Sequence, residues 1–157
     1  MCLVLFAYQP DSEHALVVAA NRDELYARPA ESAHCWPESP QLLAGRDLSA
    51  GGTWLGVTNT GRFATVTNFA EEGPADALRS RGELTQSFLL GDMPAHDFAH
   101  LLQGAEYRGF NLLVLSTSAE PRVFTWDGAL LAESTATNQS ATARSNDQSA
   151  PFSGTDS

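Results

Sequence analysis

Two apolar runs near the N-terminus constrain the fold of this chain most strongly. Residues 2–8 (CLVLFAY) and 15–21 (ALVVAAN) are rich in Val and Leu, and the turn-forming segment QPDSEH separates them. Runs of this length, joined by a short polar turn, predict two buried β-strands paired as a hairpin. A membrane-spanning helix needs about 18 or more apolar residues in succession. The sequence contains no such stretch, so we expect no membrane span.

The rest of the chain predicts further strands and two helices. We expect strands at residues 53–58, 62–68, 109–115, 122–126 and 129–131, and helices at 80–91 and 94–103. Residues 27–52 contain three Pro, Gly45 and the pair Gly51-Gly52, which predicts a long irregular connection. Strand pairs, then helices, then strand pairs indicate an α+β protein with an antiparallel sheet.

Composition changes sharply after residue 133. Residues 134–157 hold ten Ser or Thr and one large apolar side chain, Phe152. So little apolar surface cannot offset the entropy lost on ordering the segment. We therefore expect a single folded domain at 1–133 and a disordered Ser/Thr-rich tail at 134–157.

Charge excludes several classes of function. The chain has 19 acidic residues against nine Arg and no Lys, a net charge of −10, which repels a nucleic-acid backbone. The absence of Lys excludes Schiff-base chemistry and a phosphate-binding Walker lysine.

The His and Cys residues do not have the spacing of a zinc site, so we expect no metal; they are His34, Cys35, His96 and His100. Without an export signal, we expect a cytoplasmic protein that lacks a disulfide framework.

Cys2 is the most informative residue for function. Removal of Met1 by an aminopeptidase would leave a terminal cysteine whose α-amino group has a reference pKa of about 7.7–8.0. One residue would then hold a nucleophile and the base that activates it. The alternative is a small apolar residue at the start of a buried strand.

Polar residues follow the second apolar run directly. Asn21, Arg22, Asp23 and Glu24 lie at a strand end, a rigid position from which side chains can reach a site. Arg22 could polarise a thiolate or clamp a carboxylate, and Asp23 could orient the terminal ammonium group. The alternative is a solvated turn whose ion pairs contribute little stability.

A third candidate region is the glycine-rich hairpin. Gly51, Gly52 and Trp54 could let the backbone approach a ligand, and Asn68 at the end of the hairpin is a candidate oxyanion donor. The alternative is an ordinary hairpin with a buried Trp.

Several separated motifs together resemble the NRDE-motif family, to which the transport and Golgi organisation protein 2 homologues belong. They are MCLVLFAY, AANRDELYARPA, LLAGRDLSAGGTWLGVTNTGRFATVTNF, RSRGELTQSFL and YRGFNLLVL. The family is similar to the cysteine N-terminal-nucleophile hydrolases, which cleave amides and fold as an αββα sandwich. That similarity implies Cys2 as nucleophile, Asp23 as the acid that orients the terminal amine, and Asn68 as an oxyanion donor. The arginine of those hydrolases lies three positions before the aspartate, where this chain has Ala20, whereas Arg22 is adjacent to Asp23.

The resemblance covers only the N-terminal half of the family, so the expected αββα sandwich is incomplete on its C-terminal side. We expect a hydrolase that attacks a small amide or ester through Cys2 without a cofactor. The alternatives are a non-enzymatic carrier of haem or an acyl compound, a trafficking factor, and a truncated inactive fragment. The expected partners are a small molecule and, through uncovered sheet, a second copy of the chain.

Overall fold

The computed structural model describes residues 2–69, 79–100, 102, 106–116, 119–127, 130–135 and 141–144. Within these residues, seven antiparallel strands form a large sheet in the order β3 (Ala30–Trp36), β4 (Ser39–Asp47), β5 (Leu55–Thr58), β6 (Phe63–Asn68), β7 (Phe110–Leu115), β8 (Arg122–Trp126) and β9 (Leu131–Thr135). A small sheet has the order β10 (Ala141–Arg144), β1 (Leu3–Tyr8) and β2 (Leu16–Asn21). The predicted α+β class is confirmed.

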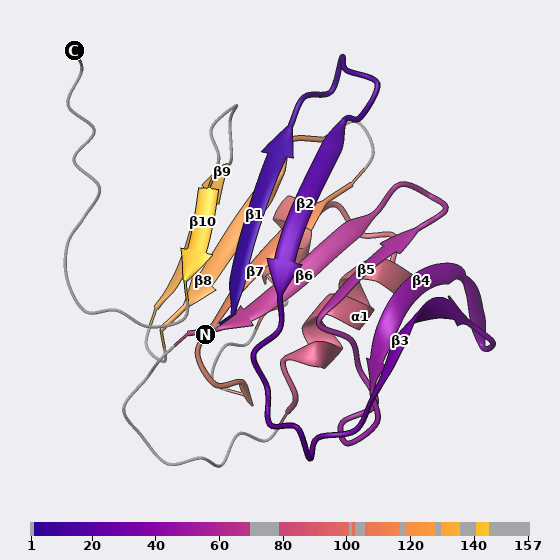
Figure 1. Ribbon diagram of the computed structural model, residues 1–157. Coiled ribbons are helices and arrows are strands. Elements are labelled where there is room, and N and C mark those ends of the chain that lie inside the picture. Colours follow the sequence, from indigo (N-terminus) through magenta and orange to yellow (C-terminus); the bar gives the residue numbers. More distant parts are fainter. Residues whose placement is uncertain are drawn as a thin grey trace.

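The two faces of the large sheet carry different layers (Figure 1). The helices α1 (Gly82–Leu90) and α2 (Ala95–His100) pack on one face, where Phe88 and Phe98 meet edge to face at 5.3 Å. Leu112 and Val114 of β7 complete this core, and both are fully buried. Alternation along the strand turns Leu113 to the opposite face.

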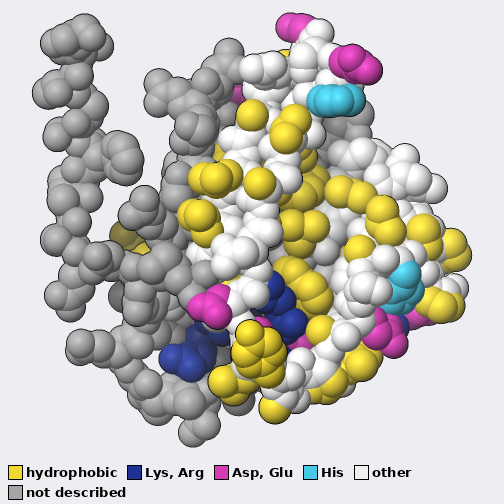
Figure 2. Space-filling view, viewed as in Figure 1, with side chains coloured by type: hydrophobic (Ala, Val, Ile, Leu, Met, Phe, Trp, Pro, Cys, Tyr) yellow, Lys and Arg dark blue, Asp and Glu magenta, His cyan; other side chains and the backbone are white. Residues whose placement is uncertain are grey.

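On that opposite face lies the small sheet. Val4 and Phe6 of β1 are buried against Phe63, Leu113 and Leu115. The described residues therefore form three layers in the order helix, sheet, sheet, which match three layers of the expected αββα sandwich. No helix among them covers the outer face of the small sheet, where Leu5 and Val17 are exposed and apolar side chains gather (Figure 2).

The expectation of an irregular connection at residues 27–52 is wrong. This segment contains β3 and β4, which pair as a hairpin around the two-residue turn Pro37-Glu38. β3 is an edge strand whose only buried residue is Trp36, so it lacks the apolar alternation by which a strand is recognised. The prolines occupy positions that a hairpin tolerates: Pro29 precedes β3, Pro37 lies in the turn, and Pro40 is near the start of β4, where the pairing with β3 is irregular.

β9 crosses the expected C-terminal domain boundary at residue 133, and β10 lies beyond it. β9 ends at Thr135, and β10 pairs antiparallel with β1, with Leu3 opposite Arg144. β10 thus lies within the segment for which composition predicts a disordered tail. The remainder of that tail, residues 136–140 and 145–157, lies outside the described residues, as does Met1. None of the helices in the described part is long and apolar enough to span a membrane.

Candidate functional site

The register of the first hairpin brings the predicted nucleophile to the NRDE residues. Leu3 at the start of β1 lies opposite Asn21 at the end of β2, and the Leu3 N–H donates to Asn21 Oδ1 at 2.9 Å. Cys2 therefore faces the residues that follow β2. The Asp23 N–H donates to Cys2 Sγ at 3.4 Å, and the Cys2 thiol lies 3.7 Å from the Asp23 carbonyl oxygen.

The Cys2 thiol is half-buried at one end of the space between the two sheets. Burial raises the pKa of Cys2, and the negative charge of Glu24 acts in the same direction. The positive charges of the chain's amino terminus, of Arg22 and of Arg81 oppose this rise in pKa. In the chain that retains Met1, the thiol is thus mainly protonated near neutral pH.

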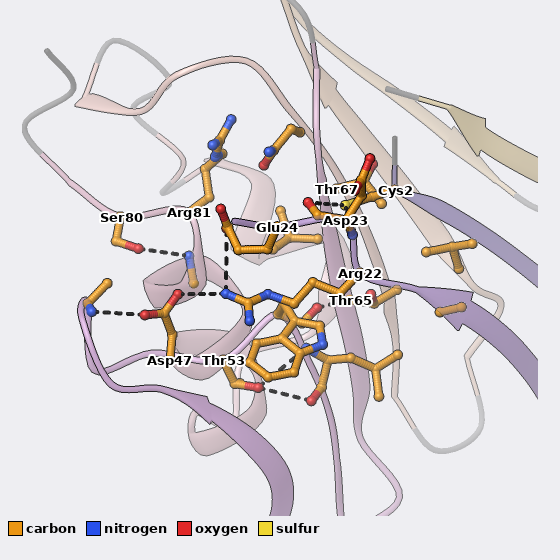
Figure 3. A pocket seen from close by; sticks show the side chains of 18 of the residues that line it. Cys2, Arg22, Asp23, Glu24, Asp47, Thr53, Thr65, Thr67, Ser80 and Arg81 are labelled. Atoms are coloured by element: carbon orange, nitrogen blue, oxygen red, sulfur yellow. Dashed lines mark hydrogen bonds and ion pairs between the residues drawn. The ribbon is translucent and has the colours of Figure 1, made fainter. Parts of the chain in front are cut away.

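Arg22 is held in a cage rather than against the thiol (Figure 3). Its Nη2 donates to Asp47 Oδ2 at 3.0 Å and lies 3.6 Å from Glu24 Oε2. Its guanidinium group stacks over Trp54, with Cζ 4.1 Å from the ring centroid. Stacking on an aromatic face and hydrogen bonding at one edge fix the plane of the guanidinium group.

Asp47, which the sequence analysis did not single out, is the centre of this cage. Its Oδ2 accepts hydrogen bonds from Arg22 and from Arg28 Nε at 2.8 Å, and its Oδ1 accepts from the backbone N–H groups of Ser49 and Ala50. Burial alone would raise the pKa of Asp47, but the hydrogen bonds from Arg28, Ala50 and Ser49 hold that pKa below its ordinary value. The sequence Asp-Leu-Ser-Ala-Gly-Gly at residues 47–52 is a recognisable signal for such an Asx turn.

Replacing Asp47 with Asn is expected to lower the free energy of unfolding by about 2 kcal/mol at pH 7, because charge-assisted hydrogen bonds are lost. Since the pKa of Asp47 is depressed in the folded state, its contribution is present above the unfolded-state pKa and is lost as pH falls through the folded-state value. Urea unfolding should therefore show that the difference in free energy of unfolding between the wild-type chain and Asp47→Asn is smaller at pH 3 than at pH 7. An equal difference at both pH values would contradict this role.

The glycine-rich hairpin serves packing as well as the site. A Cβ on Gly45 would lie 2.7 Å from Trp54 Cη2, so Gly45 makes the room in which Trp54 supports Arg22. Gly51 has φ +80°, and a Cβ on Gly52 would lie 2.7 Å from the carbonyl carbon of Gly82. Gly51 therefore supplies the positive φ of the turn, and Gly52 allows close contact with the start of α1. Neither glycine lines the pocket, whereas Trp54 does.

The end of β6 also lines the pocket, and Thr67 of this strand lies near Cys2 (Figure 3). Asn68 is exposed at the end of this strand and lines the pocket, together with Thr65 and Thr67. Thr67 is buried and accepts a hydrogen bond from Asn111 Nδ2 at 3.3 Å. Alternation along β6 turns the side chains of Thr67 and Asn68 to opposite faces of the sheet, and both residues line the pocket.

These elements enclose a pocket of about 550 Å³. Seven of the nine predicted site residues line it: Cys2, Asn21, Arg22, Asp23, Glu24, Trp54 and Asn68. Lining residues that the sequence analysis missed include Arg28, Asp47, Thr65, Thr67, Arg79, Ser80, Arg81, Gly82 and Arg108. Five of the nine Arg residues of an acidic chain thus converge here with three carboxylates, those of Asp23, Glu24 and Asp47.

The residues considered for a metal lie elsewhere. His34 and Cys35 are on β3, where His34 Nδ1 lies 2.8 Å from the Ser32 carbonyl oxygen. Across the described ranges, no group of three or more His, Cys, Asp or Glu side chains is arranged to hold a metal ion.

Comparison with known proteins agrees with the motifs. The model of the family described as Transport and Golgi organisation 2 matches residues 1–152. The chain is 37% identical over 129 residues to the Transport and Golgi organization protein 2 homolog of Bos taurus, with 76% of this chain and 47% of that protein covered. The homolog of Homo sapiens is 35% identical over 127 residues, with 75% and 46% covered. The chain thus spans about half the length of these curated relatives.

A solved structure, the penicillin V acylase from Agrobacterium tumefaciens, is similar to 88% of this chain and 44% of its own, with a TM-score of 0.40 and 12% sequence identity. The family assignment does not depend on this likeness, because the matching family model already covers nearly the whole chain. The chain belongs to the Transport and Golgi organisation 2 family.

Proposed function

We propose that the chain, once Met1 is removed, hydrolyses a small amide or ester with Cys2 as the nucleophile. The observation that carries this proposal is the position of the Cys2 thiol, which is half-buried at the first residue before β1 and opens into the 550 Å³ pocket. After removal of Met1, the thiol and the terminal α-amine would belong to the same residue, Cys2. The proposal needs no cofactor.

The chemistry would follow in two steps. The α-amine of Cys2 takes the thiol proton, and the thiolate attacks the carbonyl carbon of the substrate. The carbon–nitrogen or carbon–oxygen bond then breaks, the leaving group takes the proton from the α-ammonium, and a thioester to Cys2 remains. Water cleaves the thioester to a carboxylic acid and restores the thiol.

Neighbouring residues support these steps by their positions. Asp23 lies beside Cys2, and its carboxylate would orient the new terminal ammonium. Arg22 and Arg81 place positive charge near the sulfur, which favours the thiolate. Asn68 also lines the pocket, and its amide N–H would donate to the oxyanion of the tetrahedral intermediate.

The test is the pH dependence of thiol alkylation in the Cys35→Ser variant, in which Cys2 is the single thiol. Because an ammonium group on the same residue favours the thiolate, iodoacetamide should react with the processed chain at a lower pH midpoint than with a chain that retains Met1. Intact mass establishes which form is present. Retention of Met1 in the folded, soluble protein would overturn the hydrolase proposal.

A carrier of a hydrophobic small molecule, such as haem or an acyl compound, is the second candidate. One observation favours it: the apolar side chains of Leu25, Tyr26 and Leu48 are exposed, and Leu25 and Tyr26 follow directly on the pocket residues Arg22 to Glu24. A carrier would bind its ligand equally well in the Cys2→Ala variant and would release no product. Product formation that depends on Cys2 decides for the hydrolase.

A further inference from the structure

The caged guanidinium group of Arg22 has hydrogen-bonding capacity that the protein does not use. All its contacts to acidic side chains in the described part of the chain run through Nη2, to Asp47 at 3.0 Å and to Glu24 at 3.6 Å. The N–H groups of Nε and Nη1 donate to no acceptor among those same residues. The Arg22 side chain lines the pocket and is 21% exposed, so a ligand oxygen in the pocket can accept from these N–H groups in place of water.

The geometry of the cage keeps those donors available. Trp54 occupies a face of the guanidinium plane, so the edges stay open, and Asp47 holds one edge. Asp47 also accepts from Arg28 Nε at 2.8 Å, so one carboxylate serves two guanidinium groups. Glu24 accepts the N–H of Leu25 at 3.0 Å and lies beyond hydrogen-bond distance of both arginines.

We propose that Arg22 binds a carboxylate of the substrate, so that the substrate is an amide or ester that also carries a carboxylate group. The planar fork of a guanidinium group matches a carboxylate in shape and charge. A phosphate carries about −1.5 to −2 charge, and Asp23, Glu24 and Asp47 around the same pocket would repel it more strongly. Asp47 and Trp54 act as positioning residues, because each acts on the ligand through Arg22.

This inference takes the pocket to be the substrate site and rests on the proposed function. Its test compares the p-nitroanilides of glutaric and pentanoic acid, which have acyl chains of equal length with and without a terminal carboxylate. The processed wild-type chain should prefer the glutaryl compound about 10- to 100-fold in kcat/KM. Arg22→Gln should remove the preference, and Arg22→Lys should restore part of it. Arg46→Gln, which removes an arginine outside the pocket, should keep it.

A binding experiment separates failure of this inference from failure of the proposed function. In the Cys2→Ala variant, calorimetry should detect glutarate but not the neutral glutaramide, and Arg22→Gln should abolish the signal. Glutarate binding without hydrolysis of either anilide would overturn the hydrolase and support the carboxylate site. Equal hydrolysis of both anilides without glutarate binding would overturn the carboxylate site alone, as would Arg22-dependent binding of inorganic phosphate in preference to glutarate.

Discussion

Replacement of Arg62 by Met is expected to lower the free energy of unfolding by about 3–5 kcal/mol. Arg62 is only 8% exposed, and its Nε and Nη2 donate to the carbonyl oxygens of Phe88 and Met93, both at 2.8 Å. Its Cζ lies 3.9 Å from the ring centroid of Phe88. Met keeps similar volume but leaves the carbonyl groups of Phe88, in α1, and Met93, between α1 and α2, without their charged donor. Each such loss costs about 1.5–3 kcal/mol.

Urea unfolding at pH 7 measures this effect. Arg46→Met is the matched control, because Arg46 forms a surface ion pair with Glu38 and should change stability by about 1 kcal/mol or less. Burial lowers the pKa of Arg62 below its usual value, although Asp92 opposes the shift. Equal losses in the two variants would show that Arg62 does not hold α1 to the sheet.

The proposed hydrolase function predicts that replacement of Cys2 by Ala reduces amide hydrolysis by about 10³-fold or more, since loss of the proposed nucleophile removes the covalent route. The side chain is half-buried, and its Sγ accepts one long hydrogen bond from Asp23, so the variant should fold. Initial rates on glutaryl p-nitroanilide, with intact mass to verify the terminus, give the comparison.

Cys35→Ser is the control for this experiment. Cys35 is exposed on β3 and does not line the pocket, so its loss should leave the rate unchanged. Full activity in Cys2→Ala would show that hydrolysis does not use Cys2 as its nucleophile.

The sequence predicted most of the elements whose apolar side chains face the core in a regular pattern. β1, β6 and β7 each bury apolar side chains, and β2 half-buries Leu16 and Val18 within its run of Val, Leu and Ala. The predicted ranges of these four strands differ from the structure by one residue at most. β3 could not be found in this way, because six of its seven residues are not buried. β10 could not be found because it pairs with β1 through the backbone in a segment poor in large apolar side chains.

Site prediction succeeded where neighbours in sequence are also neighbours at a strand end. Asn21, Arg22, Asp23 and Glu24 line the pocket because β2 ends there. Asp47 was missed because its importance comes from Arg22, a partner 25 residues away. The glycines of the hairpin were assigned to a ligand, whereas Gly52 allows close contact with the backbone of Gly82. A glycine pattern alone does not tell a close approach by a ligand from one by the chain itself.

The position of β1 in its sheet has a consequence for synthesis of the chain. One neighbour, β2, follows within the first 21 residues, whereas the other, β10, leaves the ribosome about 120 residues later. At about 5–20 residues per second, one edge of β1 stays open for roughly 6 to 25 s on the nascent chain. In that interval the amino end of the strand is accessible to the aminopeptidases that act on nascent chains. The same open edge can pair with a strand of another nascent chain, so crowded polysomes are where misassembly of this fold would begin.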